Sequence, residues 1–341
     1  MSRDALLEVH DLRKHFPASG ALLGSSRHVR RMVRAVDGVT FSVERGETLA
    51  LVGESGCGKS TLGRCIVRLI EPTGGAIHFR GEDITRAPGG RIRELRRHIQ
   101  IIFQDPYASL NPRMTVGQIL REPLDIYAEG GHEARARKVR HLLDRVGLPA
   151  RFVQAYPHEL SGGQRQRVGI AAALALAPEL IVADEPVSAL DLSVQAQILN
   201  LLAGLQREYG LSFLFISHDL GVVRHFSDRV AVMYLGRIVE IAPTEELFTS
   251  PRHPYTQALL ASIPLPDPRR RADPLPLSGE LPSPLDPPSG CHFHPRCPYA
   301  MPHCRTQSPP RYDVGSEHYA TCFLLESADE RPAVRAGGVQ P

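Results

Sequence analysis

The sequence predicts an α/β protein with a mostly parallel sheet, followed by an irregular extension rich in proline and cysteine. Over the first 250 residues, short continuous apolar runs alternate with helical stretches, which is typical of buried parallel strands joined by helices. A glycine-rich loop lies between one such strand and a helix. Prolines accumulate after residue 250, and each proline fixes φ and removes a backbone donor. We therefore expect two regions, residues 1–250 and residues 251–341.

The predicted elements follow from these apolar runs. The expected strands are Leu6–Val9, Val39–Val43, Thr48–Val52, Ile99–Phe103, Leu180–Ala183 and Phe213–Ser217. Helices are predicted from Lys59 onward, over Ala134–Val146 and over Leu160–Leu176. The last two lie in a polar, helix-rich block at about residues 105–178, which we interpret as a helical subdomain inserted into the α/β core.

Composition excludes several classes of protein. The 341 residues include 40 basic and 37 acidic side chains, a net charge of +3, which favours no nucleic-acid partner. No apolar run reaches the roughly 20 residues that a membrane-spanning helix needs, and the N-terminus lacks the apolar core of a signal peptide. We expect a cytoplasmic chain that reaches any membrane through a partner.

Residues 53–60 read GESGCGKS and match the phosphate-loop pattern G-x-x-x-x-G-K-[ST] between a strand and a helix. Glycines let successive backbone N–H groups converge on phosphate oxygens, a lysine can reach the β- and γ-phosphates, and the final hydroxyl can bind Mg²⁺. The candidate nucleotide-binding residues are Gly53, Glu54, Ser55, Gly56, Cys57, Gly58, Lys59, Ser60 and Thr61. Cys57 either fills a small variable position or is a redox-sensitive thiol.

A second candidate site, formed by two acidic residues, follows the buried strand that starts at Leu180. Asp184 stands at the carboxyl end of this strand, where it suits a Mg²⁺ ligand, and Glu185 follows it. A carboxylate beside the metal can act as the general base that activates water. ATP and Mg²⁺ are therefore the predicted cofactors.

Further motifs occur in a fixed order around these two. Leu160-Ser161-Gly162-Gly163-Gln164 precedes the acidic pair, Gln104 follows an earlier strand, Ser188–Asp191 follows the pair, and His218 follows the strand FLFIS. In these motifs, over about residues 6–245, the chain resembles the ATP-binding subunit of ABC transporters. The resemblance implies an ABC ATPase fold with a P-loop core, an antiparallel β subdomain and an inserted helical subdomain.

Other segments resemble the oligopeptide/dipeptide branch of that family. They are QDPYASLNPRMTVG after Gln104, HPYTQALLASIP from His253, and GCHFHPRCPYAMPHC in the extension. An insertion between Phe16 and Arg34 is similar to the second of the two ATPase subunits of that branch. The resemblance implies a motor subunit of an importer for dipeptides or oligopeptides. The alternative is that the same kind of motor serves nickel or glutathione import.

The resemblance also assigns expected roles to residues. One ATP is expected to contact Lys59, Ser60, Gln104, Asp184, Glu185 and His218 of this chain, with Mg²⁺ held by Ser60, Gln104 and Asp184. Lys59, Gln104, Glu185 and His218 form the expected catalytic group, with His218 sensing the γ-phosphate. The second site, on a partner ATPase, is expected to be closed by Ser161, Gly162, Gly163 and Gln164. Phe16 either stacks on adenine or is an ordinary aromatic residue.

The implied partners are a second ABC ATPase subunit, in a heterodimer, two membrane permease subunits and, indirectly, a substrate-binding protein, at the cytoplasmic face of the membrane. Tyr107–Met114 either contacts the permease or is a plain surface loop. A non-transport ABC ATPase is disfavoured, because the chain has one phosphate loop and no heptads. A purely regulatory, non-hydrolysing subunit is disfavoured by Glu185.

The extension carries four cysteines, Cys291, Cys297, Cys304 and Cys322, in the pattern C-x5-C-x6-C-x17-C. A metal centre can order a segment that has little apolar material for a core of its own. The gaps are wider than the two to four residues usual for zinc sites, and four thiolates can hold a 4Fe–4S cluster, as is expected of the branch. Zinc remains an alternative, with His292, His294, His303 and His318 nearby, as do free or disulfide-paired cysteines.

Overall fold

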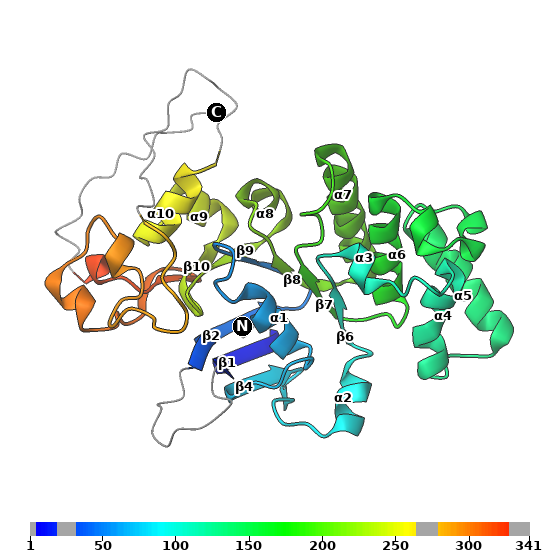
Figure 1. The fold of residues 1–341 in the computed structure, drawn as a ribbon, viewed down its shortest axis with the longest axis horizontal. Coiled ribbons are helices and arrows are strands. Elements are labelled where there is room, and N and C mark those ends of the chain that lie inside the picture. Colours follow the sequence, from blue (N-terminus) through cyan, green and yellow to red (C-terminus); the bar gives the residue numbers. More distant parts are fainter. Residues whose placement is uncertain (1–4, 19–31, 264–278, 327–341) are drawn as a thin grey trace.

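The computed structural model describes residues 5–18, 32–263 and 279–326. Most of the insertion between Phe16 and Arg34, part of the proline-rich run and the end of the chain lie outside these residues. The described residues form two sheets, one of eight strands and one of four. The predicted α/β class with a mostly parallel main sheet is confirmed (Figure 1).

The main sheet has the strand order β11-β12-β10-β9-β3-β8-β7-β6. Its strands are β3 (Thr48–Val52), β6 (Ile99–Ile102), β7 (Leu180–Asp184), β8 (Ser212–Ile216), β9 (Arg229–Tyr234), β10 (Arg237–Pro243), β11 (Tyr312–Gly315) and β12 (His318–Ala320). Strands β9, β3, β8, β7 and β6 pair in parallel. Every residue of β3, β7 and β8 is buried, because helices cover both faces of a parallel sheet.

The second sheet is antiparallel, with the order β2-β1-β4-β5. Its strands are β1 (Ala5–Pro17), β2 (Met32–Glu44), β4 (Gly74–Phe79) and β5 (Glu82–Asp83). Strands β1 and β2 are longer than the predicted Leu6–Val9 and Val39–Val43. Their polar outer ends hide the strand pattern, although the backbone pairing continues to Pro17 and Met32.

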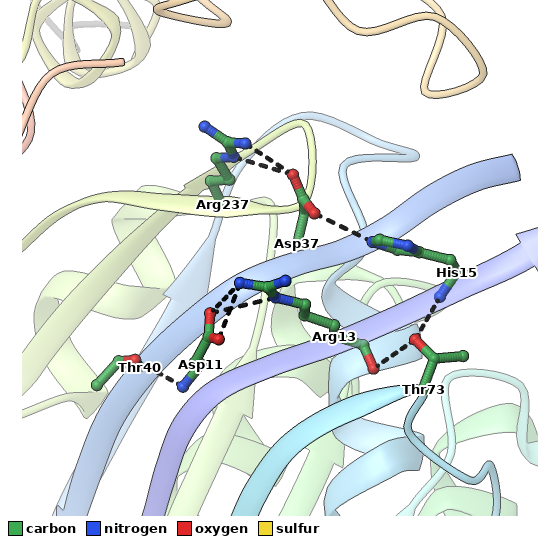
Figure 2. Close-up of polar contacts among 7 residues, drawn as sticks. All are labelled: Asp11, Arg13, His15, Asp37, Thr40, Thr73 and Arg237. Atoms are coloured by element: carbon green, nitrogen blue, oxygen red, sulfur yellow. Dashed lines mark hydrogen bonds and ion pairs between the residues drawn. The ribbon is translucent and has the colours of Figure 1, made fainter.

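Asp37 of β2 connects this antiparallel sheet to the main sheet. Figure 2 shows its carboxylate between Arg237 of β10 and His15 of β1, with an Arg237 Nη2 to Oδ2 distance of 2.8 Å and a His15 Nε2 to Oδ1 distance of 3.0 Å. Burial raises the pKa of Asp37, but the hydrogen bonds from Arg237 and His15 and the charge of Arg237 outweigh burial and hold the pKa below its usual value.

The helices complete the architecture. They are α1 (Lys59–Ile66), α2 (Gly89–Leu95), α3 (Pro106–Ser109), α4 (Val116–Ile126), α5 (His132–Arg145), α6 (Gly162–Leu174), α7 (Leu192–Tyr209), α8 (Leu220–Phe226), α9 (Thr244–Thr249) and α10 (Pro254–Ala261). Short 3₁₀ turns span Ala150–Gln154, Pro157–Glu159, His294–Arg296, Pro302–Arg305 and Phe323–Leu325. Helices α4, α5 and α6 gather at one end of the molecule, opposite the extension (Figure 1).

The extension is more regular than its proline content predicts. It contains α10 and a hairpin, β11–β12, whose strand β12 pairs with β10 of the main sheet. Without β12, β10 would be an open edge with unpaired backbone groups. The hairpin therefore docks the extension onto the core by backbone hydrogen bonds that a composition argument cannot foresee.

A buried histidine strengthens this docking. His318 of β12 contacts Glu240 of β10 through Nε2, at 2.9 Å from Oε1, and Glu246 of α9 through Nδ1, at 2.7 Å from Oε1. The side chains of His318 and Glu240 are fully buried. Burial lowers the pKa of His318, but its hydrogen bonds to both carboxylates and their charges outweigh burial and raise the pKa above the usual value.

We predict that replacing His318 with Gln lowers the free energy of unfolding by about 3 kcal/mol at pH 6, because it leaves two glutamates without their cation. The raised pKa means that the stabilisation is complete below about pH 6.5, the unfolded-state value, and is lost as the pH rises through the folded-state value. The loss should therefore be smaller at pH 9. Denaturant unfolding at both pH values measures it, with the exposed His132→Gln as control. An equal loss at pH 6 and pH 9 would contradict a charged bridge.

Candidate functional site

The predicted phosphate loop connects β3 to α1, and its glycines are needed for close backbone approach. Gly53 has a φ of +151°, and a Cβ there would lie 2.1 Å from the Met233 carbonyl oxygen. Gly58 has a φ of +109°, and a Cβ there would lie 1.9 Å from the Ala35 carbonyl oxygen. Only glycine fits either position. The loop is thereby pressed against β9 of the main sheet and β2 of the antiparallel sheet.

Lys59 lies across this loop. Its Nζ donates to the carbonyl oxygens of Gly53, at 2.7 Å, and Glu54, at 3.0 Å. The side chain is buried although no carboxylate pairs with it in the contacts described. A buried ammonium group held by the loop's own carbonyls is placed to meet phosphate oxygens that enter the loop. Cys57 is also buried, and burial raises the pKa of its thiol, which disfavours the redox-sensitive interpretation.

The acidic pair faces the phosphate loop. Ser60 donates from Oγ to Oδ1 of Asp184 at 2.7 Å, so two of the predicted Mg²⁺ ligands are adjacent. Burial raises the pKa of Asp184, and Glu185 nearby adds to the rise, while the Ser60 hydrogen bond opposes it. A hydroxyl and a carboxylate are the hard oxygen ligands that Mg²⁺ prefers. These residues therefore fit the ion.

Glu185 is the centre of a second cluster. Its Oε2 accepts a hydrogen bond from Gln104 Nε2 at 3.1 Å and lies 3.0 Å from His218 Nδ1. Glu185 has a φ of +47°, a conformation that costs energy in a non-glycine residue and is concentrated at functional sites. The three predicted residues, which come from three separate segments, meet at one carboxylate oxygen. Gln104 contacts Glu185 here, and no contact of Gln104 with Ser60 or Asp184 is described.

One pocket of about 460 Å³ brings the phosphate loop together with Gln104, Glu185 and His218, and its size suits a nucleotide-sized ligand. Asp184 borders this pocket only through its hydrogen bond with Ser60. The pocket is lined by Val33, Ala35, Ser55, Gly56, Gly58, Lys59, Ser60, Thr61, Gln104, Glu185, His218 and Pro284. Sequence reasoning missed Val33, Ala35 and Pro284, which carry no motif. Phe16 does not line the pocket. It pairs with Val33 in the sheet, and Lys14 Nζ lies 4.8 Å from its ring centroid.

The predicted signature residues lie elsewhere, at the start of α6. Ser161 caps the helix by accepting from Gln164 N at 3.3 Å, and the Gln164 side chain accepts from Ser161 N at 2.9 Å. A Cβ on Gly163 would lie 2.6 Å from Val194 of α7. Ser161, Gly162, Gly163 and Gln164 are absent from the lining of the pocket and are at least partly exposed. They are therefore accessible to another chain.

The four cysteines of the extension meet as predicted. Cys291, Cys297, Cys304 and Cys322 line one pocket, together with His253, His294 and apolar neighbours. All six cysteines of the chain fall within the described residues, and each is free. The disulfide alternative is therefore not realised in this structure.

The surroundings of the sulfur atoms fit a metal–thiolate centre. One backbone N–H group approaches a sulfur directly, since Met301 N lies 3.4 Å from Cys304 Sγ. The backbone at Phe293, Tyr299 and Leu324 lowers the pKa of Cys291, Cys297 and Cys322 and opposes the effect of burial. Such hydrogen bonds stabilise sulfur ligands. Burial raises the pKa of Cys297 to about 11 and of Cys322 to about 12, and the neighbouring thiols add to the rise. Because burial disfavours the charged form, these cysteines need a bound cation to be held as thiolates.

The spacing of the sulfurs distinguishes between metals. Around one zinc ion, bonds of about 2.3 Å bring four sulfurs within about 4 Å of one another. Among the described residues, the group whose ligand atoms all lie within 4.8 Å of one another is Glu8, His10 and His78, and it includes no cysteine. No three of the four cysteine sulfurs therefore lie as close together as a single zinc ion would hold them. Of the four nearby histidines, His318 is engaged by Glu240 and Glu246.

The fold and the pocket at the phosphate loop define the class of the protein. It is an ATPase with the phosphate loop, acidic pair and helical insertion of an ABC cassette. Residues 36–188 match the family described as ABC transporter, and residues 239–304 match the oligopeptide/dipeptide transporter C-terminal region. The oligopeptide transport ATP-binding protein AppF of Bacillus subtilis is 52% identical over 326 residues, covering 95% of this chain and 98% of AppF.

Two further comparisons support membership in the same family. A protein of Sinorhizobium fredii named "Probable peptide ABC transporter ATP-binding protein y4tS" is 55% identical over 325 residues, covering 95% of this chain and 91% of that protein. Among solved structures, the ADP- and phosphate-bound dimer of the ATP-binding cassette MJ0796 has a TM-score of 0.61 and 29% identity, covering 70% of this chain and 98% of that one.

The chain belongs to the ATP-binding proteins of the oligopeptide/dipeptide ABC transporter family. It is an ATP-hydrolysing motor subunit of an importer in that family. Membership implies association with a second ATP-binding subunit and with a membrane permease. No helix among the described residues is long and apolar enough to cross a membrane.

The close approach at Gly58 makes a prediction about stability. Gly46 and Gly58 both have positive φ, but a Cβ at Gly46 would meet nothing within 4 Å. Gly46→Ala should cost about 1–2 kcal/mol of unfolding free energy from backbone strain alone. Gly58→Ala should cost about 1–3 kcal/mol more, because the Ala35 carbonyl must move. Denaturant unfolding without nucleotide measures both variants, and equal losses would show that the carbonyl contact does not constrain the loop.

Proposed function

We propose that this chain couples ATP binding and hydrolysis to peptide import, with residues 1–250 as the nucleotide-binding domain, about 105–178 as its helical subdomain, and residues 251–341 as the extension. The observation that carries this proposal is the single Glu185 oxygen shared by Gln104 and His218, in the same pocket as Lys59 and Ser60. AppF and y4tS, which are named for oligopeptide and peptide transport, support a peptide cargo. Nickel or glutathione import by the same motor is the alternative.

In the proposed site, Lys59 and the loop N–H groups bind the phosphates, and Ser60 and Asp184 hold Mg²⁺. When bound, the ion neutralises charge on the phosphate oxygens. Glu185 accepts a proton from the attacking water as general base. Gln104 and His218 orient the Glu185 carboxylate, and we propose that Gln104 joins the metal ligands and His218 contacts the γ-phosphate when nucleotide enters. We also keep Phe16 as a proposed contact of adenine. For this contact, the ends of β1 and β2 around Phe16 and Val33 must move toward the base.

The proposed assembly is a heterodimer with a second ABC ATPase subunit, two permease subunits and an indirect substrate-binding protein, at the cytoplasmic face of the membrane. The exposed signature residues from Ser161 to Gln164 close the partner's ATP, where the N–H groups of the α6 N-terminus favour phosphate. The partner's signature completes the pocket of this chain. Closure and reopening then bias the permease between two states.

The segment Tyr107–Met114 is the proposed permease contact. Tyr107 is 66% exposed, and the Arg165 guanidinium lies 3.7 Å from its ring centroid. An aromatic ring held in this way on a surface is typical of an interface anchor. The segment follows Gln104 directly, so a movement at the γ-phosphate would reach the permease over a short stretch of chain.

We predict that Glu185→Gln lowers kcat for ATP hydrolysis about 100- to 10,000-fold, the contribution of a general base. The affinity for ATP should stay unchanged, since Gln keeps the shape and the hydrogen bond from Gln104. Hydrolysis is measured in the assembled transporter and binding with a fluorescent ATP analogue, and Glu133→Gln, an exposed change on α5, is the control. Hydrolysis that persists in the Gln variant would refute the role of Glu185.

For the extension we propose that Cys291, Cys297, Cys304 and Cys322 hold a 4Fe–4S cluster. The support is the shared pocket, the backbone N–H group of Met301 near the Cys304 sulfur, and a spacing of the sulfurs wider than one zinc ion allows. A cluster separates its four thiolates by the iron–sulfur core, so this wide spacing of the sulfurs suits it. Its proposed role is to order the extension, because ligand binding offsets the entropy lost by an irregular chain.

Oxygen-free purification should yield about four iron and four sulfide per chain, with a brown absorbance. Cys297→Ser should lose both, because one of four ligands is gone. Cys65→Ala should keep both, since Cys65 is a buried cysteine outside the extension and controls for thiol loss alone. One zinc without sulfide, or no metal at all, would overturn the cluster.

A further inference from the structure

We infer that the extension is part of the nucleotide site, and that Arg296 is a positioning residue that sets ATP affinity by holding Glu54 of the phosphate loop. The inference goes beyond the role of the extension proposed above, because it assigns the extension an effect on the ATP site itself. It rests on three contacts, from Arg296, Tyr255 and Pro284.

The first contact is a partly buried ion pair. Arg296 Nη1 lies 3.0 Å from Oε1 and 3.1 Å from Oε2 of Glu54. The Arg296 side chain is 6% exposed and the Glu54 side chain 25% exposed, so water screens the pair less than it screens a surface pair. Glu54 lies inside the phosphate loop, 242 positions from Arg296 in the sequence. The loop's one acidic side chain is therefore held by the extension, and it is absent from the lining of the nucleotide pocket.

The second contact acts on the backbone of the same residue. Glu54 N donates to the Tyr255 hydroxyl at 2.9 Å. Tyr255 is fully buried in α10, which begins at Pro254 and is capped by His253, whose Nδ1 accepts from Tyr255 N at 3.0 Å. The Tyr255 ring packs against Phe293 at 5.4 Å between centroids. The HPY segment thus fixes the backbone at Glu54 while Arg296 fixes its carboxylate.

The third contact closes the pocket from another side. Pro284 of the extension lines the nucleotide pocket, and its carbonyl oxygen accepts from Arg34 N at 3.0 Å. Arg34 lies between Val33 and Ala35, which also line the pocket. The extension therefore reaches the site at two places, the phosphate loop and the wall formed by β2.

These contacts affect binding because the loop must hold its N–H groups converged before phosphate arrives. A loop that is already in its binding conformation loses less entropy when the ligand binds. Without Arg296, the Glu54 carboxylate is free to turn toward the anionic ligand. The loop then keeps only the Tyr255 hydroxyl of the two contacts that the extension makes with Glu54. Both effects weaken ATP binding, and neither removes a group from the reacting atoms.

The test compares Arg296→Met, Arg296→Lys and Arg311→Met in the full chain. Arg311 also pairs with a carboxylate, Asp313, but within the extension, so it controls for the loss of an arginine there. We expect Arg296→Met to weaken ATP binding about tenfold, the typical effect of losing a hydrogen bond to a charged group. Arg296→Lys should restore part of the affinity, because it keeps the charge but has different geometry. Arg311→Met should bind as the unmodified chain does.

A double-mutant cycle shows whether Arg296 acts through Glu54. In a Glu54→Gln background, Arg296→Met should have little further effect on ATP affinity, because the two side chains act as a pair. In the assembled transporter, the change should fall on KM for ATP, with kcat little altered. Unfolding free energies are measured in parallel. Stability lost with unchanged ATP affinity, or a full additional loss in the Glu54→Gln background, would overturn the positioning role.

Cys297, beside Arg296, extends the inference and rests on the proposed cluster. Cys297→Ser and metal-stripped protein should bind ATP as weakly as Arg296→Met, and metal-stripped Arg296→Met should bind no more weakly than that. Iron is measured in the same samples. Metal-free protein that binds ATP as tightly as loaded protein would overturn the coupling and leave the cluster standing. Absence of iron from the unmodified chain would overturn both cluster and coupling, while the Arg296 cycle would still decide the positioning role.

Discussion

The arrangement depends on how the phosphate loop is seated. Three parts of the molecule meet at it: the antiparallel sheet through the Ala35 carbonyl, the main sheet through the Met233 carbonyl, and the extension through Arg296 and Tyr255. The first two contacts are steric and require glycine, whereas the last two are polar and bear on Glu54. Because all three parts press on one short loop, a shift in any of them changes the geometry that phosphate meets.

The extension is tied to the core in a manner that suits a segment with little apolar material. Its hairpin adds to the sheet edge at β10, and the His318 imidazolium bridges Glu240 and Glu246 beneath it. Polar anchors of this kind are sensitive to charge, whereas apolar packing is not. The aromatic group of Tyr234, Tyr255 and Phe293, with centroids 4.7 to 5.4 Å apart, supplies the apolar part of the contact.

The sequence allowed much of the core and the site to be predicted, because the signals there are local. The buried strand Thr48–Val52 matches β3, and three of the residues expected around ATP lie together, with Glu185 beside Gln104 and His218. The gathering of the four cysteines was also expected. In each case a short motif carries its own structure or chemistry, independent of the rest of the chain.

The contacts that could not be predicted join segments that lie far apart in the sequence. Pro284 and Val33 carry no motif, and their place in the pocket depends on how distant segments pack. The Arg296–Glu54 pair joins residues 242 positions apart, and neither position signals the other. The strands β9 and β10 were also missed, although both are continuously buried apart from their ends. Periodicity reports which face is buried but not which partner covers it.

The proposed division of the site between two chains has a physical consequence for the extension. The pocket of this chain holds the phosphate loop and Glu185, whereas its signature faces outward at the α6 N-terminus. In the proposed assembly, binding energy from ATP is released in two stages, first to one chain and then on closure against the partner. An element that alters the first stage alone, as Arg296 does through Glu54, changes how often the loaded state is available for closure. It does so without touching the groups that hydrolyse ATP. The extension thus occupies a position from which it can set the rate of the cycle at low ATP while leaving the chemistry unchanged.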